Sequence, residues 1–358
     1  MMSIGLFAQQ PSANLDQIRN GTPSSPIYNP QWVNGNVGAS NAHFVEGFSI
    51  PYRCVMTHLT PGTEIMVIFE YDAREGSKHA IDFITHYKNI QPHNSIFGHD
   101  PENIYPLQGI EANTLAPGNL GYDSVYIDIL SPPTFNSPVA GEPTNTFAGL
   151  DPLLQKVVMY GGVPNPDSAA FSWSQPYADL SIAHSHQRFR INFIAQNDTV
   201  VLSWGGHIAS QQTWGTGESA VNINGSPYHM RLIDWNLSNL GNQDRSCNAD
   251  AVYVTPPCDF TGPATLCANQ VGTFTVDIDD PGYTYNWYIQ TDPPATASAA
   301  AIAGSNTGAS VDVNAGNVEG SFTLVVEVTY QQNGEPITST CSQEVTVYCP
   351  TTTWTTNP

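Results

Sequence analysis

Charge is scarce in this chain, and positive charge is the scarcest. Only 11% of the 358 residues are charged, and ten Lys and Arg stand against 31 Asp and Glu, for a formal net charge of −21. All ten basic residues precede position 246, whereas residues 256–358 contain ten acidic side chains and no basic one. Such a negative field repels nucleic acid and anionic membrane surfaces, so we expect neither as a partner.

Long apolar runs and closely spaced cysteine pairs are missing as well. The chain has no apolar run of the length that crosses a membrane, so we expect no membrane insertion. The six cysteines form no Cys-x-x-Cys pair, which argues against a zinc knuckle. Their even number favours disulfides in an oxidising compartment, and hence a secreted protein. We expect the pairs Cys267–Cys341, Cys258–Cys349 and Cys54–Cys247; the alternative is free buried thiols, above all at Cys54.

Glycine, proline and aromatic residues are plentiful. The chain has 29 Gly and 28 Pro, and Trp, Tyr and Phe number 7, 16 and 14. Together with 40% hydrophobic residues, this composition is typical of a loop-rich, all-β extracellular protein that can still build a core. The length is sufficient for two domains.

Short strands recur through the first two thirds of the chain, between turn-forming residues. They mix β-branched and aromatic residues with some alternation and are expected at 64–72, 79–87, 122–130, 154–162, 187–195, 199–207, 228–235 and 250–254. This pattern predicts a jelly-roll-like β-sandwich over residues 46–255. Residues 9–45 are polar and rich in turn residues, so we expect an extended arm. Residues 1–8 are similar to the tail of a signal peptide.

The last third of the chain predicts a second domain after the hinge "TPPCDF". Its strands predict an immunoglobulin-like sandwich over residues 256–349, followed by a linker at 350–358. Trp287 in "YNWYI" is the expected core tryptophan. The Asn333-Gly334 step predicts a tight hairpin between two alternating strands.

Both parts resemble modules of large secreted bacterial surface proteins. The rear part is similar to PKD-like or Ig-like repeats, through "LC-x-N-x-x-G-x-F/Y-x-V" at Leu266–Val276 and "Y-x-W" at Tyr285–Trp287. The front part, through "KHAIDFITHY" and "SWGGHIASQQTWGTGES", resembles an N-terminal module of substrates of a type IX-like secretion route. The resemblance implies location and architecture, and it implies no activity.

The loop that follows the strand at 199–207 contains the best candidates for a ligand site. We expect Gly205-Gly206 to end or kink that strand. Trp214 could present an exposed ring to a sugar, or it could plug the end of the sandwich. His207 and His229 could meet across a hairpin beside Tyr228, but we expect neutral, hydrogen-bonded histidines instead. Ser219 in "GTGES" has no strand–Ser–helix context, so a Ser–His–Asp hydrolase remains an alternative without geometric support.

Two further stretches could bind metal. The Asn- and Asp-rich loop at 236–250 offers oxygen ligands at Asn242, Asp244, Asn248 and Asp250, which suit a structural Ca²⁺ ion; the same residues also satisfy turn backbones without metal. In "AHSHQRFR", His184 and His186 share one face of a strand with Arg188 and Arg190. Those cations oppose a metal ion, so we expect a polar strand face opposite Phe189, Ile191 and Phe193.

The sequence as a whole predicts a non-enzymatic, secreted cell-surface module. Its role would be adhesion, ligand capture or assembly of an extracellular layer or filament. The expected partner is an extracellular glycan or protein surface, or a second copy of the chain. Two alternatives stay open: a carbohydrate-binding module of a larger degradative enzyme, and a hydrolase built on the front domain.

Overall fold

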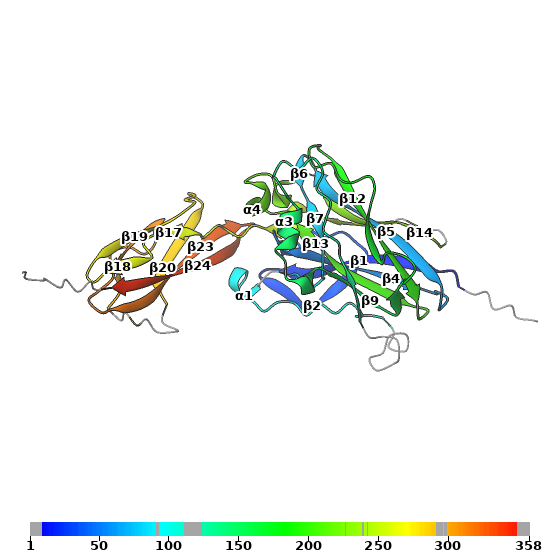
Figure 1. The fold of residues 1–358 in the computed structure, drawn as a ribbon, viewed down its shortest axis with the longest axis horizontal. Coiled ribbons are helices and arrows are strands. Elements are labelled where there is room, and N and C mark those ends of the chain that lie inside the picture. Colours follow the sequence, from blue (N-terminus) through cyan, green and yellow to red (C-terminus); the bar gives the residue numbers. More distant parts are fainter. Residues whose placement is uncertain are drawn as a thin grey trace, which may run out of the picture. The chain divides into compact units, whose positions relative to one another are not determined.

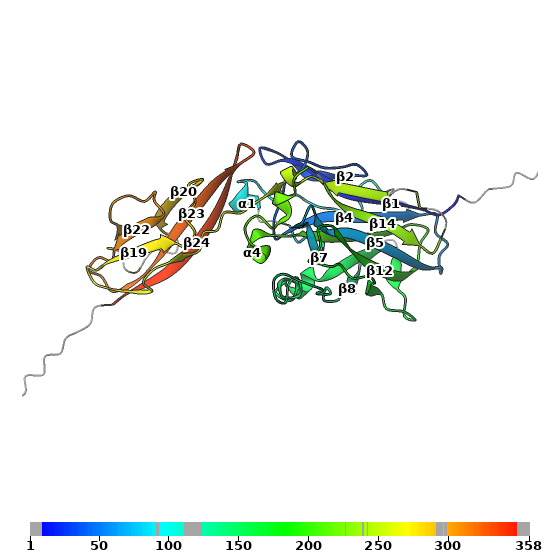
Figure 2. The same cartoon turned by 90° about the horizontal axis from the view of Figure 1, so that it is seen from above.

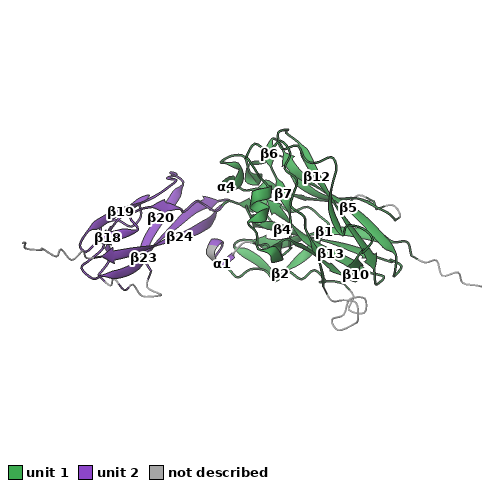
Figure 3. Cartoon of the chain, in the orientation of Figure 1, with its two compact units in different colours: residues 1–92, 99–254 green, residues 93–98, 255–358 purple. Residues whose placement is uncertain are grey.

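The structure is a computed structural model that divides into two compact units. It describes residues 9–90, 93–110, 124–225, 227–237, 240–241, 243–290, 296 and 299–348. Unit 1 comprises residues 1–92 and 99–254, and unit 2 comprises residues 93–98 and 255–358 (Figure 3). The expected signal-peptide tail at 1–8 and the expected linker at 350–358 lie outside the described residues. Each unit is described by itself below.

Unit 1 contains two β-sheets, each seven-stranded over the described residues (Figures 1 and 2). The first sheet has the order β2-β1-β4-β13-β9-β8, and β7 also pairs with β13. Its strands are β1 (Ser12–Thr22), β2 (Ser25–Val33), β4 (Ser49–Thr57), β7 (Ile81–Thr85), β8 (Val125–Asp128), β9 (Lys156–Tyr160) and β13 (Val200–Ile208).

The second sheet has the order β10-β12-β5-β14-β15, and β11 and β6 pair with β12 and β5. Its strands are β5 (Glu64–Glu75), β6 (Lys78–His79), β10 (Gly162–Pro164), β11 (Phe171–Ser174), β12 (Ser185–Ala195), β14 (Tyr228–Trp235) and β15 (Gln243–Cys247).

Short elements complete the unit. A parallel pair joins β3 (Phe44–Val45) to β16 (Val252–Tyr253). The helical pieces are α3 (Thr144–Ala148), α4 (Gln211–Trp214), η1 (Pro152–Leu154), η2 (Ala220–Asn222) and η3 (Ala249–Ala251); α1 (His93–Ile96) lies in the segment counted with unit 2. In the described part of the chain, no helix has the length and apolar character needed to cross a membrane.

The two sheets of unit 1 share one hydrophobic core. Trp204 on β13 is fully buried, and its ring lies 4.5 Å from that of Phe69 on β5 and 5.8 Å from that of Phe189 on β12. These contacts join side chains of opposite sheets. Burying rings of this size on both inner faces is what holds a β-sandwich together.

Unit 2 is a smaller sandwich of two four-stranded sheets over the described residues. One has the order β17-β19-β22-β21 and the other β18-β24-β23-β20. Their bounds are β17 (Phe260–Thr261), β18 (Thr265–Cys267), β19 (Val271–Val276), β20 (Tyr283–Ile289), β21 (Ala301–Ile302), β22 (Ser310–Asn314), β23 (Gly320–Gln332) and β24 (Glu335–Tyr348).

The core and the hairpin of unit 2 are those expected. Trp287 is fully buried and packs edge-on against Phe260, with ring centres 5.0 Å apart. Asn333 and Gly334 connect β23 to β24 with φ of 55° and 85°. Positive φ at both central residues is the mark of the tight turn that suits twisted strands. The predicted fold class, a β-sandwich followed by an immunoglobulin-like sandwich, is confirmed.

The expected extended arm at 9–45 is wrong. Residues 12–33 form β1 and β2, and β1 pairs with β4 inside the first sheet. Leu15 and Ile18 of β1 are buried in the core, yet so are the polar residues Gln17 and Asn20. The sequence did not indicate this strand, because its buried polar side chains depend on hydrogen-bond partners from distant segments, which a local pattern does not reveal.

The cysteine pairing differs from the one expected. Cys258 is bonded to Cys341, with Cα atoms 5.5 Å apart, so neither predicted partner of these two residues is correct. Cys54 and Cys247 are buried free thiols, so the expected bond between them is wrong as well. Cys267 is free and exposed, and Cys349 lies outside the described residues. Burial raises the pKa of the Cys247 thiol to about 12, which keeps it protonated and unreactive.

The Gly205-Gly206 step does not end its strand, which is a further correction, although the pairing with β7 is irregular between Gly206 and Ile208. β13 runs through both residues and pairs there with β4 on one side and β7 on the other. A Cβ on Gly205 would lie 2.6 Å from Thr85 Oγ1 and 2.8 Å from Ser49 Cβ. Glycine is therefore required by the close approach of its neighbours and not by a turn.

Replacing Gly205 by Ala should destabilise unit 1. The added Cβ has no space between Thr85 and Ser49, and overpacking of this kind costs about 1–3 kcal/mol. Gly35→Ala is the matched control, since a Cβ at Gly35 meets nothing within 4 Å. Thermal unfolding of both variants checks this, and equal melting temperatures would contradict it.

The Cys258–Cys341 bond should contribute strongly to the stability of unit 2. The two cysteines have a sequence separation of 83. A cross-link of this span reduces the entropy of the unfolded chain and so contributes about 4–5 kcal/mol to the free energy of unfolding. Cys258→Ser should therefore lower the melting temperature of unit 2, while Cys267→Ser should not. Non-reducing peptide mapping checks the pairing, and a Cys267–Cys341 peptide would disprove it.

Candidate functional sites

Trp214 is a plug and not an exposed platform. The side chain is 6% exposed, and its ring stacks on that of His79 at 3.5 Å with an angle of 6°. Its indole Nε1 donates a hydrogen bond of 2.8 Å to Asp82 Oδ1. Burial and the nearby Arg74 guanidinium lower the pKa of His79 to about 3, so a neutral imidazole faces the indole. The expectation of a sugar platform at Trp214 is wrong.

His207 and His229 do not meet, and Tyr228 does not lie open beside them. His207 on β13 is buried, stacks on Phe83, and lies 3.2 Å from Asp82 through its Nδ1. His229 is on β14 of the other sheet, and its Nδ1 donates to Asp244 Oδ1 at 2.7 Å. Tyr228 is fully buried. His229 alone of the four expected ligand-binding residues is partly exposed.

Ser219 anchors the "GTGES" loop. Its buried hydroxyl donates to Glu46 Oε1 at 2.5 Å. The same carboxylate accepts the backbone N–H groups of Gln211 at 2.9 Å and Val221 at 3.1 Å. Burial raises the pKa of Glu46 against the effect of these hydrogen bonds. A serine hydroxyl held by a carboxylate in this way does not have the serine–histidine geometry of a hydrolase.

The residues expected to bind calcium have other partners. Asp244 bonds His229 and lies 3.5 Å from the Nε of Arg231, a cation that opposes Ca²⁺. Asp250 Oδ1 accepts the N–H of Ala39 at 3.2 Å. The side chain of Asn248 lies beside Gly38, and Asn242 lies outside the described residues. Calcium binding by this loop stays a prediction, and equal melting temperatures in EGTA and in millimolar Ca²⁺ would exclude it.

A polar ladder covers the outer face of the second sheet. Antiparallel register sets His186 opposite Asp72 and Arg188 opposite Glu70, across β12 and β5. Arg188 Nε donates to Glu70 Oε2 at 2.7 Å, and His186 Nδ1 donates to Asp72 Oδ1 at 2.8 Å. On the other side, Arg231 donates to Asp72 at 2.6 Å. The expectation of a polar face opposite buried Phe189, Ile191 and Phe193 is confirmed.

Opposite charges hold this ladder in definite protonation states. Although burial alone would raise the pKa of Asp72, hydrogen bonds from His186 and Arg231 outweigh it and lower that pKa. The hydrogen bond to Asp72 raises the pKa of His186, against partial desolvation. The ladder therefore favours a charged imidazole at a surface position, where His186 is 44% exposed.

Two loops build a groove beside this ladder. The groove has a volume of about 420 Å³ and is lined by Glu70, Phe135, Pro176, Tyr177, Asp179, Ile182, His184, Ser185, His186 and Arg188. Tyr177 is 38% exposed and Phe135 is 48% exposed. The N–H of Leu180 donates to the Phe135 carbonyl at 3.1 Å, and Asn136 donates to Asp179 at 3.0 Å, so the two loops hold each other.

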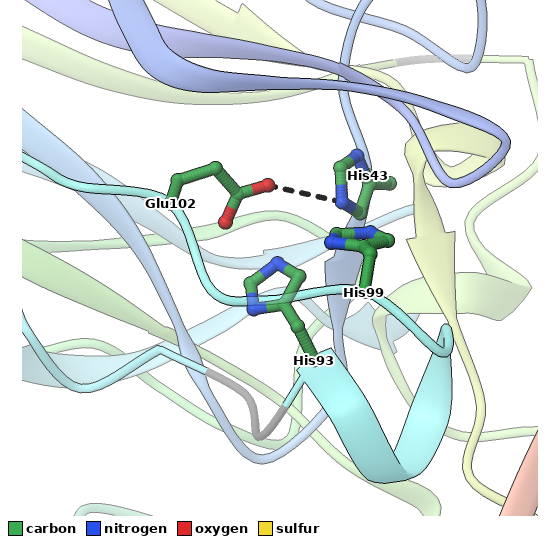
Figure 4. Close-up of side chains that lie close together, drawn as sticks. All are labelled: His43, His93, His99 and Glu102. Carbon is green, nitrogen blue, oxygen red and sulfur yellow. Dashed lines mark ion pairs between the residues drawn. The ribbon is translucent and has the colours of Figure 1, made fainter.

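A second cluster, of imidazoles and a carboxylate, lies at the start of β3 (Figure 4). His43, His99 and Glu102 each offer a ligand atom, and these atoms lie within 4.8 Å of one another. His43 and Glu102 are buried, and His43 Nε2 is 3.1 Å from Glu102 Oε1. Figure 4 also draws His93, whose segment is counted with unit 2, and we build the cluster from the three residues of unit 1.

Neither the groove nor this cluster was among the predicted sites. Tyr177 and Phe135 are lone aromatics in Pro-rich loops, so nothing in the sequence marks them as neighbours. The segment "HDPE" at 99–102 did offer a signal, because it contains an imidazole and a carboxylate three residues apart. His43 is distant in the sequence, and only the fold adds it.

Comparison with known proteins identifies no family. No family model matches the chain, and no curated protein matches it. Murine CEACAM1b is 10% identical over 54% of this chain and 92% of that chain, with a TM-score of 0.18. The I9–I11 tandem of titin is 9% identical over 88% of this chain and 96% of that chain, with a TM-score of 0.15. TM-scores this low carry no conclusion about this chain.

The ladder predicts a pH dependence that NMR can follow. His186 should titrate above the ordinary value of 6.5, so its stabilising pair with Asp72 is complete below that pH and is lost as pH rises through the raised pKa. The contribution of Asp72 is present above 3.8 and is lost as pH falls through its lowered pKa. The pair is therefore strongest between about pH 4 and pH 6.5.

Asp72→Asn should lower the pKa of His186. His79 and His86 are the internal controls; burial, with nearby Arg74 and Lys88, lowers their pKa values to about 3 and about 4, and neither contacts Asp72. The C2 proton shifts of the imidazoles give all three titrations in one experiment. A His186 pKa that Asp72→Asn leaves unchanged would contradict this assignment.

Proposed function

We propose that this chain is a non-enzymatic, ligand-capturing part of an extracellular surface protein. In this proposal unit 1 binds a neutral glycan in the groove beside the polar ladder, and unit 2 acts as a spacer. The groove carries the proposal, because it combines exposed aromatic rings with polar side chains held in place by ion pairs. A disulfide in unit 2 and the resemblance to secreted surface modules support the extracellular location.

A sugar ring has an apolar face of C–H groups and an edge of hydroxyls. Tyr177 and Phe135 offer exposed rings to the apolar face of the sugar, and burying such rings is a major source of binding energy. Arg188 and His186 offer N–H donors to the hydroxyl groups of the sugar, and Asp179 offers acceptor oxygens to them. Sites for small molecules usually combine apolar walls with a small number of placed polar groups.

The charges of the protein favour a neutral glycan over an acidic one. A net charge of −21 repels anionic ligands at long range. Arg188 is the guanidinium that lines the groove, and it is already paired with Glu70 at 2.7 Å. A carboxylate or sulfate group on the ligand would have to compete with that pair.

The carboxylates of the groove have partners that oppose acid–base catalysis. Glu70 lies 2.7 Å from Arg188 through one oxygen and 3.5 Å from Arg231 through the other. Asp179 accepts hydrogen bonds from Ser181 and Asn136, which lower its pKa. A glycosidase needs one carboxyl group protonated near neutral pH, and the lowered pKa of Asp179 opposes that role. We therefore favour binding over hydrolysis.

The proposed role of unit 2 rests on its side chains. Residues 256–358 contain no His, Lys or Arg, so most general acid–base groups are missing from this region. The alternative partners, a protein surface or a second copy of the chain, are outcomes of the test below. A role as the binding module of a larger degradative enzyme is compatible with the same groove.

Removing an aromatic ring of the groove should weaken glycan binding. Tyr177→Ala and Phe135→Ala should each weaken the affinity for a neutral oligosaccharide, found first on a glycan array, by at least about tenfold, or about 1.4 kcal/mol. Tyr126→Ala is the matched control, because Tyr126 is 55% exposed on β8 and does not line the groove. Calorimetric titration of the full chain measures the affinities.

Three results would argue against this function. Binding of acidic glycans alone would reject the neutral ligand. Unchanged affinity in Tyr177→Ala would place the site elsewhere. An array without any bound glycan, with sedimentation showing a dimer that Tyr177→Ala dissociates, would assign the groove to self-association.

A further inference from the structure

We infer that His43, His99 and Glu102 form a site for a divalent transition metal such as Zn²⁺. Two imidazoles and a carboxylate are ligands that Zn²⁺ takes, whereas Ca²⁺ takes oxygen ligands alone. Their ligand atoms lie within 4.8 Å of one another, and all three residues belong to unit 1. This site is separate from the groove and from the Asn- and Asp-rich loop.

Hydrogen bonds orient both imidazoles toward a shared point. His43 Nδ1 lies 2.9 Å from the carbonyl of Gly21, and His99 Nδ1 lies 2.9 Å from the carbonyl of Asp100. A carbonyl oxygen can only accept, so each Nδ1 carries the proton and donates it. Each Nε2 is thereby the ring nitrogen that can coordinate a metal. Backbone carbonyls hold metal-ligating histidines in this way in known sites.

The carboxylate also has an outer support. Asn20 Nδ2 donates to Glu102 Oε1 at 3.1 Å and to the carbonyl of His43 at 2.8 Å. The N–H of His43 donates back to Asn20 Oδ1 at 3.0 Å. One buried amide therefore positions two of the three ligands, which is the arrangement that raises metal affinity.

The separation of the two buried ligand atoms fits a tetrahedral ion. Zn²⁺ bonds to nitrogen and oxygen are about 2.0–2.2 Å long, which puts neighbouring ligand atoms about 3.3–3.5 Å apart. His43 Nε2 and Glu102 Oε1 are 3.1 Å apart, so an ion between them requires little movement. His99 is less buried and completes this set of three protein ligands.

The metal would fasten a loop to the sandwich. His99 and Glu102 lie in the segment between α1 and β8, while His43 directly precedes β3. Beside the cluster, the N–H of Asn103 donates to the Tyr28 carbonyl of β2 at 2.7 Å. A bound ion adds a second, stronger link between this loop and the strands. It would stabilise unit 1 in proportion to its binding.

A competing arrangement uses the same atoms without metal. A protonated His43 could form a buried ion pair with Glu102 across the same 3.1 Å. The two arrangements differ in one measurable property, because an ion pair takes up no metal. Zn²⁺ binding by the intact chain therefore decides between them.

The test is a titration of the chelator-treated, full-length chain with zinc sulfate alone, by calorimetry and by metal analysis after dialysis. We expect one tightly bound Zn²⁺ per chain and a melting temperature higher by about 5–10 °C at a hundredfold excess over the dissociation constant. Glu102→Gln keeps the side-chain shape and should weaken binding at least about tenfold, as should His99→Ala. Co²⁺ in place of Zn²⁺ should give the intense visible absorption of a tetrahedral site.

Control variants separate this site from adventitious binding. The double variant His184→Ala/His186→Ala removes the exposed histidine pair of β12 and should bind Zn²⁺ as the unmodified chain does. Asp244→Ala/Asp250→Ala should do the same. Circular dichroism of metal-free Glu102→Gln verifies its fold. The inference is overturned by the absence of Zn²⁺ binding at micromolar concentration, by affinity unchanged in Glu102→Gln, or by binding lost only with His184 and His186.

Discussion

The contact of Trp204 with Phe69 and Phe189 is the constraint on which unit 1 depends. It joins the two sheets, and all three side chains are fully buried. Phe69 and Phe189 are direct partners in the register of β5 and β12, and so are the following pair, Glu70 and Arg188. Because side chains alternate across a strand, the register that buries the two rings also places the ion pair on the outer face. The core therefore positions the groove.

Three of the few basic side chains form ion pairs within the two sheets of unit 1. Arg53 pairs with Asp16 at 2.9 Å inside the first sheet, and Arg188 and Arg231 pair with Glu70 and Asp72 on the second. Arg53 and Asp16 are both buried, so removing either one would leave an uncompensated charge, which is costly. These basic residues thus serve the structure of unit 1, and the outer ladder gives the groove polar groups that are already oriented.

Several elements could be predicted from the sequence because local chemistry decides them. The alternation in "QRFRINFIA" predicts β12 and its buried face, and Asn333-Gly334 predicts the hairpin of unit 2. β1 was missed because Asp16, Gln17 and Asn20 read as loop residues. Each of them has a partner from a distant segment, such as Arg53 for Asp16 and His43 for Asn20. Such pairings have no local signature, so the candidate sites built on them were missed as well.

The sequence by itself determined the all-β class, the boundary between the two sandwiches, the acidic field and the core role of Trp287, since composition and strand periodicity report burial directly. Only the tertiary structure decided which cysteine bonds Cys258, that Trp214 stacks on His79, and that His43 joins His99 and Glu102. The physical reason is the same in each case. A disulfide, a ring stack and a cluster of imidazole and carboxylate side chains depend on distances of a few ångströms between residues far apart in the chain, and the packing of the sheets sets those distances.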